Sequence, residues 1–426
     1  MVRTRISSRL LLASGAAAAV TLAPCLASPF ASAAPGHADR TAAAAPPTRP
    51  LDCGPPAYNI PCYTPAQYRV AYGVTPLLSS GITGSGETVV MPELANAPGP
   101  NFTDIRQDLA AFDRKFGLPA AKLSVTTTLA GAHAPYVAGT EEVEDTEIVH
   151  AIAPGATLHV VLVPAAATTS VADFTAAMTG VIHTAIAQGA AVVSISASGG
   201  ERSFTSAEVA DIHSALEQAA DRHVTVVASS GDNGVISDNG PPKQVSLPAS
   251  DPLVLAVGGT ALNASFATGA YHGEVAWNQD TDASAGGYSV LFSRPSYQDG
   301  VPRIGAMRGV PDVAADADST TAMALTFTGG ALIPAQGTSA STPLWAGVIA
   351  LADQKAGRHL GFVNPAIYDI ARAYRSAFHD VVTGDNSVLW PTGVFTGYQA
   401  GPGWDPVTGW GSPDARVLVP LLAHAR

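Results

Sequence analysis

Short apolar runs alternate along the chain with longer segments in which apolar positions recur with helical spacing. The runs are rich in Val, Ile and Leu and predict strands: Thr88–Leu94, Thr157–Val163, Ala191–Ser196, Val224–Ser229 and Leu253–Val257. The periodic segments predict helices: Phe102–Phe116, Thr140–Ala153, Val171–Gln188 and Ser206–Arg222. Apolar strands separated by helices predict an α/β fold with a mostly parallel sheet flanked by helices on both faces.

The order of strands and helices predicts one large domain over residues 51–426, although the length alone would also allow two or three. Of the 426 residues, 47% are hydrophobic and 13% are charged, so the chain can bury a large core. Residues 265–300 alternate between polar and apolar positions and predict a hairpin. Residues 376–414 are rich in Gly, Asp and Pro with little periodicity, and so long a loop inside a domain is usually functional.

The N-terminal residues predict export. A basic start, an Ala-rich apolar stretch and Ala31-Ser32-Ala33 are typical of a signal peptide over residues 1–33, and the apolar stretch is too short to span a membrane. Residues 34–50 predict a disordered leader. In an exported chain Cys53 and Cys62 predict a disulfide. The net charge of −12 argues against nucleic acid or an anionic membrane as a partner.

A serine stands where an apolar run gives way to a predicted helix, Leu344–Lys355. The motif is Gly337-Thr338-Ser339-Ala340-Ser341-Thr342-Pro343. At a strand-to-helix turn the Ser339 hydroxyl is exposed, and the free backbone N–H groups of the helix start can hold an oxyanion. The alternative is a Ser or Thr N-cap before a helix with Pro in its first turn.

Acidic side chains form two further candidate sites. Glu141 and Asp145 are spaced i,i+4 on one helix face, and two close carboxylates raise the pKa of one of them. The alternative is a solvated acidic helix start. Asp232 lies in Ser230–Gly234, directly after a predicted strand, where open α/β sheets place their sites. The alternative there is an ordinary Asp-Asn-Gly turn.

A third acidic pattern lies near the C-terminus. Asp380 and Asp405, with the glycines of Gly401–Gly403 between them, offer the oxygen ligands that Ca²⁺ prefers. The alternative is a glycine-rich turn held by Asx hydrogen bonds. Among the histidines, His150 alone is placed to serve a subtilisin-type triad, and packing against the sheet edge is its simpler interpretation.

Taken together, the motifs resemble those of the sedolisins, or serine-carboxyl peptidases, which share the subtilisin fold. The resemblance extends from Tyr63 to the C-terminus. Its motifs are Tyr72-Gly73-Val74, Thr83-Gly84-Ser85-Gly86, Glu93-Leu94, Glu141 and Asp145 with His150-Ala151-Ile152-Ala153-Pro154, Ser230–Gly234, Pro311–Asp318, Gly337-Thr338-Ser339 and Gly401–Asp405.

The resemblance implies a role for each matching residue. Ser339 is the nucleophile, Glu141 the general base, and Asp145 shares a proton with Glu141. Asp232, together with the Ser339 N–H, forms the oxyanion hole. Glu142, Glu144 and Glu147 compete for these roles, and the five-residue step from Asp145 to His150 selects Asp145 and Glu141. One Ca²⁺ is implied, held by the carboxylates of Asp380 and Asp405 and the carbonyls of Val381, Gly401 and Gly403.

The expected protein is therefore a secreted, extracellular, monomeric endopeptidase with a subtilisin-like fold that cleaves proteins or peptides at acid pH. Acid pH is expected because Asp232 can donate to an oxyanion only while protonated. The alternatives are a tripeptidyl exopeptidase, a subtilisin that uses His150, and a pseudopeptidase that binds peptides. Two features depart from the family pattern: a short leader replaces the usual long prodomain, and Ala197 stands where several members have Trp, in a segment near which Glu93 is the outer carboxylate.

Overall fold

The centre of the molecule is an eight-stranded sheet in the order β13-β12-β10-β8-β3-β7-β5, with β16 also paired to β12. All pairings are parallel except that of β13 with β12. The bounds are β13 Tyr271–Ala276, β12 Leu255–Ala264, β10 Thr225–Ser229, β8 Val192–Ile195, β3 Thr88–Leu94, β7 Thr157–Val163, β5 Lys122–Thr127 and β16 Val313–Asp316. The predicted α/β class with a mostly parallel sheet is confirmed.

The structure is a computed structural model that describes residues 50–54, 60–95, 103–127, 137–164, 167, 169–237 and 241–425. The predicted signal peptide, 1–33, lies outside these residues, as does the predicted leader apart from its last residue. Within them, no helix is long and apolar enough to cross a membrane. Cys53 and Cys62 form the predicted disulfide, beside the short strands β1 (Leu51–Asp52) and β2 (Pro61–Cys62).

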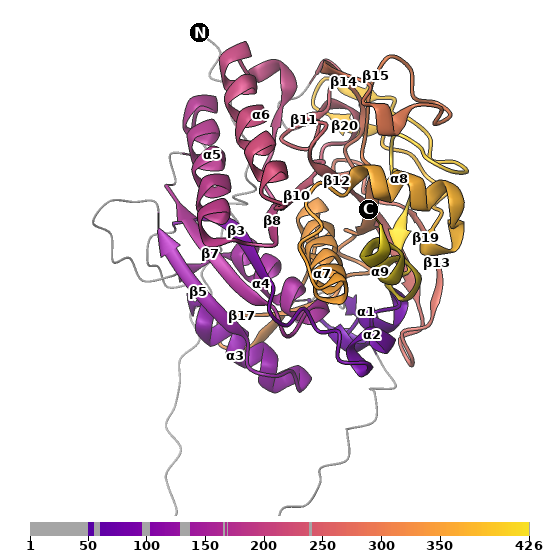
Figure 1. The fold of residues 1–426 in the computed structure, drawn as a ribbon. Helices are drawn as coiled ribbons and strands as arrows, with labels where there is room; N and C mark the ends of the chain where they lie inside the picture. Colours follow the sequence, from indigo (N-terminus) through magenta and orange to yellow (C-terminus); the bar gives the residue numbers. More distant parts are fainter. Residues whose placement is uncertain are drawn as a thin grey trace, which may run out of the picture.

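Helices cover both faces of the sheet (Figure 1). On one face lie α5 (Val171–Gln188) and α6 (Ser206–Asp221), which pack on strand residues such as Val90. On the other face lie α4 (Thr140–Ile152) and α7 (Thr338–Ala356), which share a core with Val89 and Met91. Successive residues of β3 thus enter different cores, as the two-residue repeat of a strand requires.

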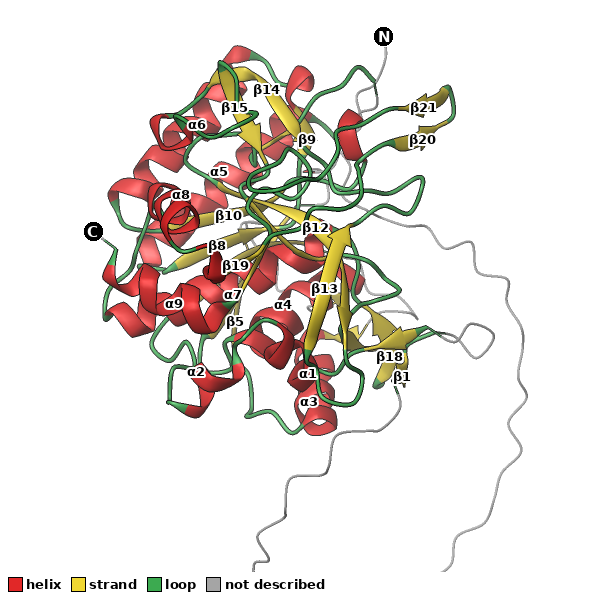
Figure 2. Ribbon diagram, turned by 90° about the vertical axis from the view of Figure 1, so that its right-hand side faces the viewer, coloured by secondary structure: helices red, strands yellow, loops and turns green. Residues whose placement is uncertain are grey.

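The remaining helices pack around the edges of these layers (Figure 2). They are α1 Pro65–Ala71, α2 Thr75–Ser79, α3 Ile105–Phe116, α8 Asn364–Ala373 and α9 Ala415–His424. The other described strands form short antiparallel pairs. These are β4 Thr103–Asp104 with β6 Val137–Ala138, β9 Gly199–Gly200 with β11 Ser246–Leu247, β14 Gly287–Ser293 with β15 Met307–Val310, β17 Ala324–Phe327 with β18 Ala331–Pro334, β19 Phe378–His379 with β22 Ser412–Pro413, and β20 Val388–Trp390 with β21 Gly393–Phe395.

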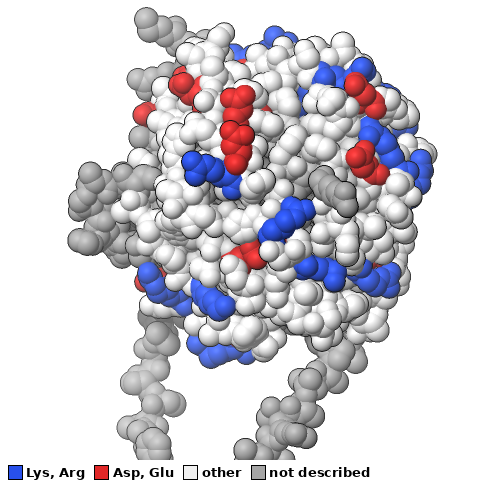
Figure 3. All heavy atoms as spheres, in the orientation of Figure 1, with Lys and Arg blue, Asp and Glu red and all other residues white. Residues whose placement is uncertain are grey.

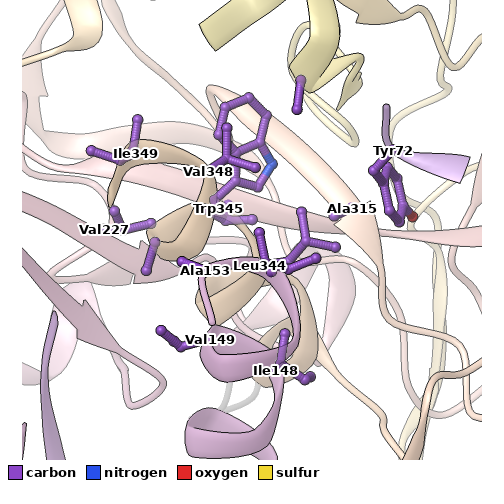
Figure 4. Close-up of a cluster of buried hydrophobic side chains, with 14 of the residues drawn as sticks. Tyr72, Ile148, Val149, Ala153, Val227, Ala315, Leu344, Trp345, Val348 and Ile349 are labelled. Carbon is purple, nitrogen blue, oxygen red and sulfur yellow. The ribbon is translucent and has the colours of Figure 1, made fainter. Parts of the chain in front are cut away.

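Helices α4 and α7 are locked together in the core (Figure 4). Ile148 and Val149 of α4 and Leu344 of α7 are fully buried in this cluster. Where the helices approach most closely, a Cβ added at Gly347 would come within 2.8 Å of Ile152, so glycine allows the contact. The Trp345 Nε1–H donates to the Ala314 carbonyl at 2.8 Å and fixes α7 against the sheet. Because both helices carry candidate catalytic residues, this packing fixes the site.

Three predicted elements differ from the structure. The strand predicted for Leu253–Val257 is β12, which extends to Ala264. The hairpin predicted for residues 265–300 does not form, because β13 pairs with β12 and β14 pairs with β15. Helix α7 begins at Thr338 rather than at Leu344, so Pro343 lies inside it. The hydroxyls of Ser341 and Thr342 donate to the Thr338 carbonyl, in the first turn of the helix, at 3.0 and 2.7 Å.

Candidate active site

Ser339 lies in the first turn of α7 and is partly exposed. The preceding Gly337 has φ 80°, and a Cβ there would stand 2.8 Å from Asp232 Oδ2, so only glycine fits. The N–H of Thr338 donates to Asp232 Oδ1 at 2.7 Å, and the Thr338 hydroxyl donates to the same oxygen at 2.9 Å. Asp232 comes from the loop after β10. It therefore performs the N-capping that the sequence alternative assigned to Ser or Thr side chains.

Glu141, in the first turn of α4, reaches Ser339. Burial and the neighbouring charge of Asp145 raise the pKa of Glu141 well above the usual range, although the nearby Ser339 hydroxyl favours its ionised form. The Glu141 Oε1 atom is buried and has no hydrogen-bond partner among the described residues. The predicted nucleophile and the predicted base are 198 residues apart in the sequence, and two helices bring them next to each other.

Asp145 lies one turn further along α4 and is completely buried. Burial raises the pKa of Asp145 to about 7, although hydrogen bonds with Ser196 and Glu93 favour its ionised form. The Ser196 hydroxyl donates to Asp145 Oδ1 at 2.8 Å. Burial and the charges of Asp145, Glu142 and Glu141 raise the pKa of Glu93 well above its usual range. Carboxyl groups this close cannot all ionise, so they share protons.

The structure separates the competing acids of α4 by what each contacts. Glu142 Oε2 accepts the Gly139 N–H at 2.6 Å and caps its own helix. Glu147 accepts the N–H and the hydroxyl of Thr326, at 2.8 and 2.6 Å, and so fastens α4 to β17. Glu144 Oε1 accepts the Gln336 N–H at 2.7 Å. Glu141 is the member of this run that bonds to Ser339.

His150 points away from Ser339. Its Nε2 atom lies 2.9 Å from the Pro119 carbonyl and 2.9 Å from Asp113 Oδ1, on the side of α3. Burial lowers its pKa, so the neutral ring is favoured there. The geometry gives His150 a packing role between α3 and α4, and this is the simpler of the two interpretations drawn from the sequence.

The C-terminal loop brings Asp380 and Asp405 to the same glycine segment. Asp380 accepts the Gly403 N–H, with distances of 2.9 and 3.2 Å to its two oxygens, and Asp405 Oδ2 accepts the Gly401 N–H at 3.0 Å. Asp405 Oδ1 accepts the N–H groups of Val407 and Thr408, both at 2.9 Å. Burial raises the pKa of Asp405 to about 6 against these hydrogen bonds.

This donor set is compatible with a hard cation. Val381 lies near the same carboxylate, because the Thr408 hydroxyl is 3.5 Å from the Val381 carbonyl oxygen and 3.2 Å from Asp405 Oδ2. Two carboxylates and a set of carbonyls within one loop are oxygen ligands of the kind that Ca²⁺ takes. No group of three or more His, Cys, Asp or Glu able to hold a metal occurs among the described residues, so a cation here would depend on carbonyls.

Two contacts of the cluster were not singled out from the sequence. Ser196 lies in a segment that the sequence analysis discussed for Ala197, and its own hydroxyl proves to be the group that bonds to Asp145. Ala197 is partly buried against the core beneath α5 and α6. Glu144 was only a competitor for the base, although its i,i+3 spacing from Glu141 places both on one face.

Comparison with known proteins gives a consistent picture. A model of the Subtilase family matches residues 119–366. Kumamolisin of Bacillus sp. (strain MN-32) is 35% identical over 381 residues, which cover 85% of this chain and 64% of kumamolisin. Sedolisin of Pseudomonas sp. (strain 101) is 40% identical over 212 residues, and human tripeptidyl-peptidase 1 is 34% identical over 249. These matches span 35% and 42% of the two relatives, so the chain corresponds to only part of each curated relative named here.

Solved structures give the same result. Pseudomonas sedolisin, a serine-carboxyl proteinase solved with two molecules of pseudo-iodotyrostatin, superposes with a TM-score of 0.71 at 28% identity, covering 84% of this chain and 97% of that one. A lanthipeptide protease with a TM-score of 0.52 and 15% identity shares the fold. The subtilisin-like fold expected from the sequence is confirmed, and the chain belongs to the subtilase family as a sedolisin-type protein.

Proposed function

We propose that this protein is a serine-carboxyl endopeptidase that hydrolyses peptide bonds at acid pH through an acyl-enzyme on Ser339. The observation that carries the proposal is the approach of Ser339 to Glu141, close enough to affect the pKa of Glu141, in a cluster of carboxyls rather than beside a histidine. The relatives named as kumamolisin, sedolisin and tripeptidyl-peptidase 1 support it.

In the proposed mechanism, the Ser339 hydroxyl attacks the scissile carbonyl while Glu141 takes its proton. Asp145 and Glu93 share a proton with Glu141, which raises the basicity of a group whose unperturbed pKa is about 4. Glu141 then protonates the leaving amine, the bond to the acyl carbon breaks, and a water molecule hydrolyses the ester by the same route.

Asp232 is the proposed oxyanion donor, together with the Ser339 N–H. Its Oδ1 atom holds the start of α7 through Thr338, so Oδ2 is the atom that would carry the donated proton. An ionised Asp232 would repel the oxyanion, so activity requires this proton. The raised pKa values of the cluster keep its shared protons at acid pH, which supports activity on the acid side.

The C-terminal loop would hold one Ca²⁺ through Asp380 and Asp405, with the carbonyls of Val381, Gly401 and Gly403. The ion would stabilise the loop by its charge and takes no part in proton transfer. Export through the predicted signal peptide would place the protein outside the cell, where its substrates would be proteins or peptides. We propose a monomer.

The test is hydrolysis of casein and of an internally quenched peptide blocked at both ends, from pH 3 to pH 8, with Ser339→Ala as the control. We expect cleavage of both substrates with a maximum on the acid side, and loss of nearly all activity in the variant. Cleavage of peptides with a free N-terminus alone would favour a tripeptidyl peptidase. Activity that rises through pH 7, or persists in Ser339→Ala, would overturn the proposal.

A further inference from the structure

We infer that Glu144 is a positioning residue for the proposed reaction: it fixes the segment that carries Ser339 at the register in which Glu141 meets the nucleophile. The inference rests on the proposed function, because it concerns the same serine and the same base. Glu144 is buried in the middle of α4, and none of the roles proposed above belongs to it.

The segment before Ser339 is held by four consecutive backbone N–H groups. The N–H groups of Ala335 and Gly337 donate to the backbone carbonyls of Met323 and Ala317, at 3.0 and 2.7 Å. The other two donate to carboxyl side chains: Gln336 to Glu144 Oε1 at 2.7 Å, and Thr338 to Asp232 Oδ1 at 2.7 Å. The nucleophile segment is therefore clamped between two carboxyls from different elements.

The spacing of the contacts on α4 gives Glu144 its role. Glu141 and Glu144 are three residues apart on one helix face, and the residues they face, Ser339 and Gln336, are also three apart; the Gln336 N–H donates to Glu144. The order is reversed between the two segments: the earlier residue of α4, Glu141, faces the later residue of the nucleophile segment, Ser339. A shift of the segment along α4 would therefore break both contacts, so the Glu144 contact fixes the distance between the proposed base and nucleophile.

Glu144 can act in this way as a neutral acid. Its surroundings are acidic: Glu141 and Asp145 lie on its own helix, and Asp232 faces it from the loop after β10. Burial and these charges raise its pKa well above the usual range, although the bond from Gln336 favours ionisation. A protonated carboxyl keeps a carbonyl oxygen that accepts the Gln336 N–H. A side-chain amide offers the same acceptor without a charge.

The experiment compares three substitutions at Glu144 by their kcat and KM on the blocked peptide. Glu144→Gln keeps the acceptor, so kcat should stay within about threefold of the original. Glu144→Leu removes the acceptor and should lower kcat by about 10- to 100-fold with little change in KM, because misplacing a reacting group by about 1 Å costs that much. Glu144→Asp keeps the acid but shortens its reach, and kcat should fall about tenfold.

Glu147 supplies the matched control. It lies one turn further along the same helix, is fully buried and also accepts a backbone N–H, but from Thr326 of β17. Glu147→Leu should lower the melting temperature without a selective loss of kcat. An equal loss of kcat in Glu147→Leu would mean that loosening α4 alone explains the effect, and would overturn the inference.

Other outcomes would also overturn it. These are an unchanged kcat in Glu144→Leu, or a loss in Glu144→Gln as large as that in Glu144→Leu. If Glu144→Leu does not fold, the Asp variant decides, because an unchanged kcat there would show that the Gln336 contact is not needed. Failure of the proposed function is distinguishable, because the unsubstituted protein would then not cleave the blocked peptide, or Ser339→Ala would still cleave it, whatever happens at Glu144.

Discussion

Two groups of carboxyl side chains lie in contrasting surroundings. At the start of α4, Glu141, Asp145 and Glu93 are set against one another, and their mutual charge adds to the cost of burial. In the C-terminal loop, Asp380 and Asp405 each accept backbone N–H groups of the Gly401–Thr408 segment. The first arrangement favours shared protons, whereas the second pairs its carboxyl oxygens with backbone N–H groups.

The two groups of carboxyls are therefore expected to depend on pH in different ways. The pKa of Asp145 is raised to about 7, so the cluster keeps its shared protons on the acid side of neutrality. The pKa of Asp405 is raised to about 6, so a cation in the loop is held best above that value. Acid therefore favours the proposed chemistry and weakens the proposed cation site.

On the face shown in Figure 3, by contrast, acidic and basic side chains are few and scattered over an otherwise uncharged surface.

The largest expected effect comes from removing the proposed base. Glu141→Gln keeps the shape of the side chain but cannot accept a proton, so kcat should fall about 10³-fold or more throughout the acid range. The control is His150→Gln, since the His150 ring faces Asp113, and this variant should keep kcat within a few-fold. Steady-state kinetics on the blocked peptide measure both. The reverse pattern would assign the base to His150.

The next effect concerns stability and belongs to the cluster alone. Asp145 is protonated in both the native and the unfolded state below about pH 4. Between about pH 4 and pH 7 the native state keeps the proton and the unfolded state loses it, so the free energy of unfolding falls as pH rises. The shift corresponds to about 4 kcal/mol across that window.

Asp145→Asn tests this sign, because a neutral amide carries no such penalty. Urea unfolding at pH 4 and pH 7 should show that the variant loses less stability between the two than the original protein does. A variant with an equal or steeper loss would show that Asp145 ionises freely in the native state. The control is Asp369→Asn, because the Asp369 side chain is 80% accessible. This variant should lose as much stability between pH 4 and pH 7 as the original protein.

The strands and helices of the central layers followed from local pattern, and most predicted bounds fall within two residues of the observed ones. The hairpin over 265–300 failed because its two strands find partners outside that range, and pairing of this kind is not encoded locally. The start of α7 was missed because Asp232, far away in sequence, caps it. Tertiary contacts decided both cases.

The candidate site divides in the same way. The residue types and spacing of Glu141, Asp145 and Ser339 were visible in the sequence, together with Asp232. The sequence could not show which acids of α4 face inward, because nearly the whole helix is buried and its apolar positions mark no single buried face. Glu144 acquires its role only through Gln336, 192 residues away. Such a contact leaves no local signal.

The smallest expected effect is removal of the proposed Ca²⁺. A ligand bound only by the native state at about 100 times its Kd stabilises that state by about 2.7 kcal/mol. Chelation at pH 7 should therefore lower the melting temperature by roughly 5 °C. Asp405→Ala should show a lower melting temperature without chelator, and chelator should shift it no further.

The pH dependence of this effect has the opposite sign to that of the α4 cluster, which makes the two separable. As pH falls through about 6, Asp405 takes up a proton, the loop loses a charged ligand, and the difference made by chelator should shrink toward zero. Calorimetric scans with and without chelator at pH 7 and pH 4.5, together with metal analysis of the untreated protein, measure this. Protein that contains no calcium beforehand and melts at the same temperature in chelator would leave the two aspartates as Asx-type supports of the loop, held by their hydrogen bonds with backbone N–H groups.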